Sequence, residues 1–111
     1  MRINQEILDI TEAIKRAVPA ERIYLFGSHA YGTPNEDSDY DFFVLLPDDG
    51  IKPLDAAQSA HRALIRVNQR TPVDILADYR SRFEDRKKLN TLERKIAREG
   101  VVLYEQNINK T

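Results

Sequence analysis

Hydrophobic positions in the first part of the chain form two kinds of pattern, a helical stripe and continuous runs typical of buried strands. A stripe with steps of three and four predicts an amphipathic helix that ends at Pro19. Its members are Ile3, Ile7, Ile10, Ile14 and Val18. An apolar run over 23–26 predicts a short strand, and a longer run over 41–46 is apolar on both faces. That second run is typical of a central strand in a covered sheet.

A second helical stripe follows the turn region at 47–53. Its members are Leu54, Ala57, His61, Leu64 and Val67. We expect His61 at the boundary of the core, where imidazole is more often a packing residue than a ligand. A third strand is predicted over 73–77.

The charged stretch 80–88 has no hydrophobic period, and we expect it to be irregular. Asn90 and Glu93 resemble a capping box for a final helix that ends at Gly100. A last strand follows over 101–104. The order helix, strand, strand, helix, strand, helix, strand predicts an α/β or α+β layered domain.

Composition narrows the class of protein. A chain of 111 residues predicts one domain over 1–111. The 17 basic and 18 acidic residues nearly balance, so we expect no direct nucleic-acid binding, which usually needs a strongly basic surface. The chain has no cysteine, which excludes disulfides and thiolate metal sites, and it has no apolar stretch approaching the ~20 residues of a membrane span. We expect a cytoplasmic protein.

Three aspartates are the candidates for chemistry. Asp39 and Asp41 lie at positions i and i+2 where the second strand begins, so their side chains share one face. Asp74 lies among apolar neighbours in the third strand, where a charge is costly unless it is paired or binds metal. Carboxylates that converge in this way suit Mg²⁺, and three of them could hold two ions for displacement at phosphorus. The plainer interpretations are an acidic turn at Asp39 and Asp41 and a solvated edge residue at Asp74.

A phosphate-binding turn is predicted at the end of the first strand. Gly27 lets a phosphate approach the backbone, and Ser28 can donate hydrogen bonds to phosphate oxygens or cap the following turn. A phosphate turn followed by acidic residues on two strands provides the parts that nucleotidyl transfer needs.

Gly27-Ser28, a gap of ten residues and then Asp39-Tyr40-Asp41 resemble the signature of the minimal nucleotidyltransferases, within the polymerase-beta-like superfamily. The run GSHAYGTPNEDSDYDFFVLL, the VDIL segment around Asp74 and the ending IAREGVVLYE are also similar to that family. The resemblance implies the nucleotidyltransferase fold, an α+β domain with a mixed, mostly antiparallel sheet of about four strands packed with helices.

The same resemblance implies roles for these residues. Asp39, Asp41 and Asp74 would bind two Mg²⁺ ions and form the catalytic site, and Asp74 would favour deprotonation of the attacking hydroxyl. Gly27 and Ser28 would contact the nucleoside triphosphate, with ATP expected as the donor. A small stand-alone member of this family often pairs with a helical HEPN ribonuclease toxin and acts as its antitoxin, adenylylating a tyrosine of the toxin.

One position departs from the family pattern, because Tyr31 stands where many members have arginine. This departure keeps a second hypothesis open, in which the chain neutralises its partner by contact with weak or no catalysis. A third hypothesis is nucleotidyl transfer to a small molecule held by a separate acceptor subunit.

Overall fold

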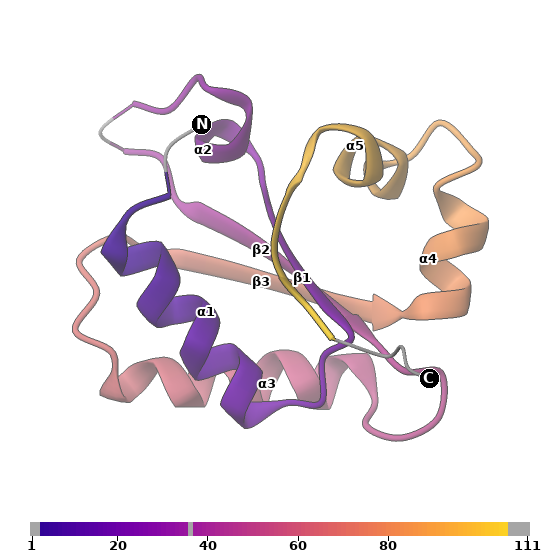
Figure 1. The fold of residues 1–111 in the computed structure, drawn as a ribbon, viewed down its shortest axis with the longest axis horizontal. Helices are drawn as coiled ribbons and strands as arrows, with labels where there is room; N and C mark the ends of the chain where they lie inside the picture. The colour runs from indigo at the N-terminus through magenta and orange to yellow at the C-terminus, as the bar shows by residue number, and fades with distance from the viewer. Residues whose placement is uncertain (1–2, 36, 107–111) are drawn as a thin grey trace.

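The computed structural model describes residues 3–35 and 37–106, which form a four-stranded sheet with helices on both faces (Figure 1). The strands are β1 (Arg22–Phe26), β2 (Tyr40–Leu46), β3 (Val73–Tyr79) and β4 (Val101–Glu105). The helices in this part of the chain are α1 (Gln5–Ala17), α2 (Ser28–Tyr31), α3 (Pro53–Ala63), α4 (Arg80–Arg86) and α5 (Leu92–Glu99). A 3-10 turn, η1 (Leu64–Arg66), continues α3. Among the described residues, no helix is long and apolar enough to cross a membrane.

The sheet has the strand order β3-β2-β1-β4. β1 pairs antiparallel with both β2 and β4, whereas β2 and β3 are parallel and are joined by the crossover through α3. The predicted α+β class with a mixed, mostly antiparallel sheet of four strands is confirmed. β2 is a central strand, as its continuous apolar run predicts, and six of its seven residues are buried.

Alternate residues of the strands pack into two separate cores, because successive side chains in a strand point to opposite faces. The larger core lies under α1 and α3 and includes Ile7, Ile10 and Ile14 of α1. This confirms the first helical stripe. α1 begins at Gln5 because the Asn4 side chain caps it, accepting a hydrogen bond from the Ile7 amide at 2.8 Å.

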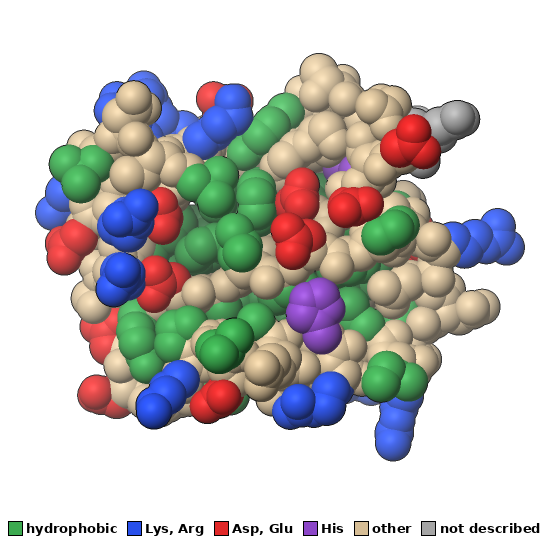
Figure 2. Space-filling view, turned by 180° about the vertical axis from the view of Figure 1, so that it is seen from behind, with side chains coloured by type: hydrophobic (Ala, Val, Ile, Leu, Met, Phe, Trp, Pro, Cys, Tyr) green, Lys and Arg blue, Asp and Glu red, His purple; other side chains and the backbone are tan. Residues whose placement is uncertain are grey.

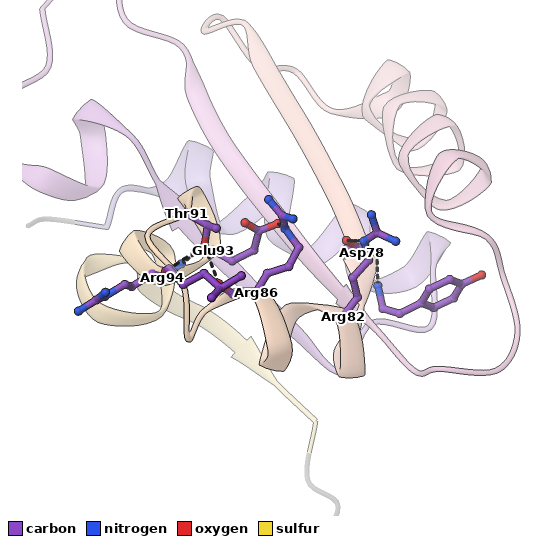
Figure 3. Close-up of polar contacts among 8 residues, drawn as sticks. Asp78, Arg82, Arg86, Thr91, Glu93 and Arg94 are labelled. Carbon is purple, nitrogen blue, oxygen red and sulfur yellow. Dashed lines mark hydrogen bonds and ion pairs between the residues drawn. The ribbon is translucent and has the colours of Figure 1, made fainter.

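The smaller core lies under α4 and α5 on the other face of the sheet (Figure 1). Each of these helices contributes one fully buried side chain, Phe83 from α4 and Ile96 from α5. The Phe83 ring packs between Tyr24 and Phe43, with ring centroids 5.7 and 5.2 Å away. Arg86 and Glu93 join the two helices by an ion pair of 2.9 Å (Figure 3).

Three local predictions were wrong. Residues 80–86 form α4 rather than irregular structure; their one buried apolar residue, Phe83, gives no sequence period. α5 is capped by Thr91, whose hydroxyl accepts from the Arg94 amide, so the expected capping box at Asn90 is absent and Glu93 binds Arg86 instead (Figure 3).

The third error concerns the inner face of α3. Leu54 and His61 are exposed, and the buried positions are Ala56 and Ala60. The stripe was right at Leu64, which is buried in the larger core, and at Ala57 and Val67, which pack against that core. It was wrong at Leu54 and His61 and did not include the buried Ala56 and Ala60.

Candidate active site

The strand registers place two of the three aspartates side by side. Phe26 of β1 is paired with Asp41 of β2, and Asp41 is paired with Asp74 of β3. Paired residues of neighbouring strands point to the same face and lie roughly 4.8 Å apart. Asp39 lies just before β2, and the buried Tyr40 separates it from Asp41. The sequence spacing and the sheet therefore bring all three carboxylates to one end of the same strands.

The three carboxylates differ in exposure. Asp41 is half-buried, whereas Asp39 and Asp74 are exposed, and Asp74 lies on the edge strand β3. The expectation that burial makes a bare charge at position 74 costly therefore does not apply in this fold. What distinguishes Asp74 is its pairing with Asp41.

The surroundings of Asp41 disfavour the charged form of its carboxyl. Burial raises the pKa of the Asp41 carboxyl, and the negative charges of Asp74 and Asp39 raise it further, while His29 acts in the opposite direction. A cation placed among the three carboxylates would relieve this repulsion, and oxygen donors of this kind are those that Mg²⁺ prefers. The chemistry of the donor set therefore fits a magnesium ion.

The three carboxylates nevertheless do not form a preformed metal site. Within residues 3–35 and 37–106, no three acidic or histidine side chains are grouped closely enough to hold an ion between them. The Asp41 carboxylate is turned back onto the loop after β1, where its Oδ2 lies 2.1 Å from the point that a Cβ on Gly27 would occupy. The three carboxylates are close enough to affect the pKa of Asp41 but too far apart to share an ion as they stand. Binding of an ion would therefore require their side chains to rotate.

Gly27 and Ser28 follow β1 directly beside Asp41. Gly27 has φ 75° and ψ −164°, a backbone conformation essentially restricted to glycine. Ser28 is the first residue of the four-residue helix α2, so the amides at this turn precede the first intrahelical hydrogen bonds. The predicted phosphate turn thus lies against Asp41, as the sequence motif requires.

Two further residues of this loop line the site. His29 packs edge-on against the Tyr40 ring, with centroids 4.6 Å apart, and its Nε2 lies 3.2 Å from the Ser38 carbonyl oxygen. The Tyr31 hydroxyl is buried, and no hydrogen bond of ordinary geometry is made to it in the described part of the chain. Burial raises its pKa, the nearby Gly27 backbone opposes this, and the charges of Glu99 and Asp41 raise the pKa further. The place of His29 two residues after Gly27 is the sequence signal that could have indicated it.

A residue far from the motif fixes the strand ends on which the site is built. The Glu6 carboxylate of α1 accepts hydrogen bonds from the Tyr40 hydroxyl, from the backbone amides of Arg70 and Thr71, and from the Thr71 hydroxyl. Tyr40 lies between Asp39 and Asp41, and Thr71 leads into β3 and Asp74. No sequence signal pointed to Glu6, because its partners are 34 and 65 positions away.

An apolar surface adjoins the acidic one. Figure 2 shows acidic side chains gathered near the middle of one face, beside a broad hydrophobic surface. Leu76 follows Asp74 on the same face of β3 and is 39% exposed. The site thus places negative charge, which suits a cation, beside an accessible apolar contact.

The sequence profile of the nucleotidyltransferase domain family matches residues 7–101 of the chain. This span contains all of the candidate site residues. None of the curated proteins compared matches the chain.

Solved structures with this fold include a candidate nucleotidyltransferase from Sulfolobus solfataricus, with a TM-score of 0.63 and 17% identity over 96% of this chain and 84% of that one. A toxin–antitoxin structure with AMP-PNP gives a TM-score of 0.58 and 26% identity over 93% of this chain and 75% of that one. A mutant of the toxin–antitoxin MntA-HpeT gives a TM-score of 0.57 and 22% identity over 94% and 75% of the two chains.

Proposed function

The chain belongs to the nucleotidyltransferase domain family, and we propose that it transfers AMP from ATP to a tyrosine hydroxyl of a helical HEPN toxin, for which it is the antitoxin. The observation that carries the proposed chemistry is the row formed by Asp41 and Asp74 on paired strands, with Gly27 and Ser28 at the end of the next strand. The proposed partner is supported by the resemblance to the minimal nucleotidyltransferases and by the similar toxin–antitoxin structures, one of them with AMP-PNP.

We assign Asp39, Asp41 and Asp74 to hold Mg²⁺, with Gly27 and Ser28 against the triphosphate. Bound magnesium supplies charge stabilisation at the phosphates and lowers the pKa of the attacking hydroxyl. The acceptor oxygen attacks the α-phosphorus, the bond from that phosphorus to the bridging oxygen breaks, and pyrophosphate leaves. Asp74 takes the hydroxyl proton, and its exposure on an edge strand leaves it accessible to an acceptor carried by another protein.

The first test is nucleotide binding by the protein alone. Thermal unfolding is measured with Mg²⁺ and each nucleoside triphosphate for the wild type, Asp41→Asn and Asp74→Asn, with Asp49→Asn as the control because Asp49 is exposed in a turn after β2. A ligand at 100 times its dissociation constant adds about 2.7 kcal/mol to the free energy of unfolding. In a domain of this size, each kcal/mol raises the unfolding midpoint by about 4–8 °C. We expect a magnesium-dependent shift that prefers ATP, is lost in both site variants and persists in Asp49→Asn.

Mass measurement of a co-expressed HEPN partner then tests the acceptor. We expect one or more added adenylyl groups on a tyrosine with the wild type and none with Asp41→Asn. A bound triphosphate without any modified partner would contradict the protein acceptor and favour transfer to a small molecule.

A second candidate function is neutralisation by contact alone. The observation in its favour is the absence of a formed metal cage among the described residues. Co-expression with the double variant Asp39→Asn and Asp41→Asn separates the two functions. Toxicity restored by the double variant supports the enzymatic account, whereas neutralisation equal to that of the wild type at the same dose supports contact alone.

A further inference from the structure

The segment that would surround a triphosphate carries no basic side chain of its own. Residues 27–41 contain four acidic residues and neither lysine nor arginine. Every phosphate group of a nucleotide is negatively charged, and lysine or arginine commonly joins backbone amides in binding phosphates. A lysine or arginine in that role would have to come from another part of the fold.

Lys95 of α5 is placed to supply that charge. Its Nζ lies 4.8 Å from the centroid of the Tyr31 ring, close enough for a cation–π contact. In the described part of the chain, it is the one lysine or arginine for which a polar or cation–π contact with the segment 27–41 is observed. The contact joins α5 to α2, and both helices lie toward the same end of β1 in Figure 1.

Tyr31 connects this lysine to the candidate site. It is the last residue of α2, its amide binds the Gly27 carbonyl at 3.0 Å, and its ring packs against both cores. One part of the ring thus meets Lys95 while the loop that carries the ring contains Gly27. The ring fixes the position of a flexible lysine relative to the phosphate turn.

The other interaction of Lys95, an ion pair with Glu99, is weak enough for a phosphate to replace it. Glu99 lies 3.7 Å from Nζ, and both side chains are about half exposed. Such exposed pairs typically contribute between 0 and about 1 kcal/mol. A hollow of about 350 Å³ on α5 is lined by three basic residues, Arg94, Lys95 and Arg98, and by one acidic residue, Glu99, so it is open to a ligand and carries more positive than negative side chains.

We propose that Lys95, held by the ring of Tyr31, is the side chain that binds the outer phosphates of the nucleoside triphosphate. This inference rests on the proposed function, since it requires a triphosphate at the Gly27 turn. The lysine stem lets the ammonium group move from the ring to a phosphate oxygen, where it makes a charge-assisted hydrogen bond. It contributes to binding of the triphosphate and of the pyrophosphate product, and it does not contact the α-phosphorus.

The test compares Lys95→Gln with Lys15→Gln in the full chain. Lys15 makes the same kind of contact elsewhere, with its Nζ 5.1 Å from the Tyr104 ring, and is the matched control. Dissociation constants for ATP, ADP and AMP are measured by calorimetry with Mg²⁺. A lost charge-assisted hydrogen bond predicts roughly tenfold weaker ATP binding by Lys95→Gln, unchanged AMP binding, and wild-type values for Lys15→Gln.

The outcomes separate this inference from the proposed function. Wild-type protein that binds no triphosphate contradicts both. Wild-type protein that binds ATP while Lys95→Gln binds it as tightly as Lys15→Gln overturns the role of Lys95 alone. Equal weakening of ATP and AMP by Lys95→Gln also overturns it, because a contact to the outer phosphates cannot act on AMP.

A second comparison tests the ring. Tyr31→Leu removes the cation–π contact and should reproduce part of the Lys95→Gln loss for ATP. Tyr31→Phe keeps the ring and should restore ATP binding relative to Tyr31→Leu. Equal binding by the leucine and phenylalanine variants would show that the ring does not position the lysine.

Discussion

At the residue scale, the site depends on a close approach between a backbone turn and a side chain. Gly27 leaves space that Asp41 Oδ2 occupies, and the turn has a conformation in which a Cβ is strained regardless of space. Gly32 also has a positive φ, of 84°, but nothing lies within 4 Å of the place a Cβ would take. A Cβ at either glycine would strain the backbone, but only a Cβ at Gly27 would also collide with the Asp41 carboxylate.

We predict that Gly27→Ala is more damaging than Gly32→Ala. Both substitutions place a Cβ at positive φ, which costs about 1–3 kcal/mol. Only Gly27→Ala also displaces Asp41, so magnesium-dependent ATP binding should be lost with that variant and retained with Gly32→Ala. Chemical denaturation gives the free energies of unfolding, and calorimetry gives the binding. Equal loss of ATP binding in both variants would show that the space at Gly27 is not what the site requires.

The motif residues were the part of the site that the sequence could predict. Gly27, Ser28, Asp39 and Asp41 lie close together in the chain, so a local spacing describes their geometry. Asp74 was chosen from its apolar neighbours, but the neighbours indicate only a strand; its position beside Asp41 comes from a parallel pairing across the α3 crossover. The assignment of these residues as ligands stays a prediction.

At the element scale, α1 fixes the relative positions of β2 and β3. Its first-turn carboxylate, Glu6, binds Tyr40 at the start of β2 and the backbone just before β3. The Tyr40 amide also donates to the Pro72 carbonyl at 3.0 Å. The two aspartate-bearing strands are therefore tied to each other and to a helix at the end where the carboxylates lie.

We predict an acid-dependent loss of stability that depends on Glu6. Burial alone would raise the pKa of its carboxyl, but hydrogen bonds from Arg70, Tyr40 and Thr71 hold it below the ordinary value of 4.5. A carboxyl with a lowered folded-state pKa contributes stability above its unfolded pKa and loses it as the pH falls through the folded pKa. Glu6→Gln should therefore melt below the wild type at pH 7, and the gap should shrink below pH 4.5.

At pH 7, Glu6→Gln should lower the free energy of unfolding by about 1 kcal/mol. This is the value for hydrogen bonds to a charged group, reduced because the site is partly exposed to solvent. This corresponds to a midpoint about 4–8 °C lower. Glu12→Gln is the control, since Glu12 lies on the exposed side of α1 with Lys15 and Arg16. A gap between Glu6→Gln and the wild type that stays constant from pH 7 to pH 3 would contradict the prediction.

The elements with a hydrophobic period were predictable from the sequence, and those without one were not. α1 has a helical period and β2 has a continuous apolar run, and both predictions were confirmed. α4 has a single buried apolar residue, Phe83, among six polar ones, so its helical state depends on a pocket between Tyr24 and Phe43 that forms only in the folded sheet. The inner face of α3 was missed in part for a related reason, since the buried Ala56 and Ala60 give little hydrophobic signal.

At the scale of the whole molecule, the two faces of the sheet are covered unequally. α1, α3 and η1 lie over the larger core, to which α1 alone gives three fully buried isoleucines. α4 and α5 are held over the other face mainly by Phe83 and Ile96, with the Arg86–Glu93 ion pair between them (Figure 3). Segments with few buried apolar contacts open locally at lower free energy than the core.

We therefore predict that α4 and α5 exchange their amide hydrogens faster than β2 in the free protein, and that magnesium and ATP slow the exchange of α5. The slowing follows if Lys95 leaves the Tyr31 ring for a phosphate, because the ligand then links α5 to the turn at Gly27. Hydrogen exchange followed by mass spectrometry measures both effects, with α1 as an internal control that the ligand should leave unchanged.

In Lys95→Gln, saturating ATP should protect the Gly27 turn without protecting α5. Equal exchange of α5 and β2 in the free protein would contradict the first expectation, and protection of α5 in Lys95→Gln would contradict the second.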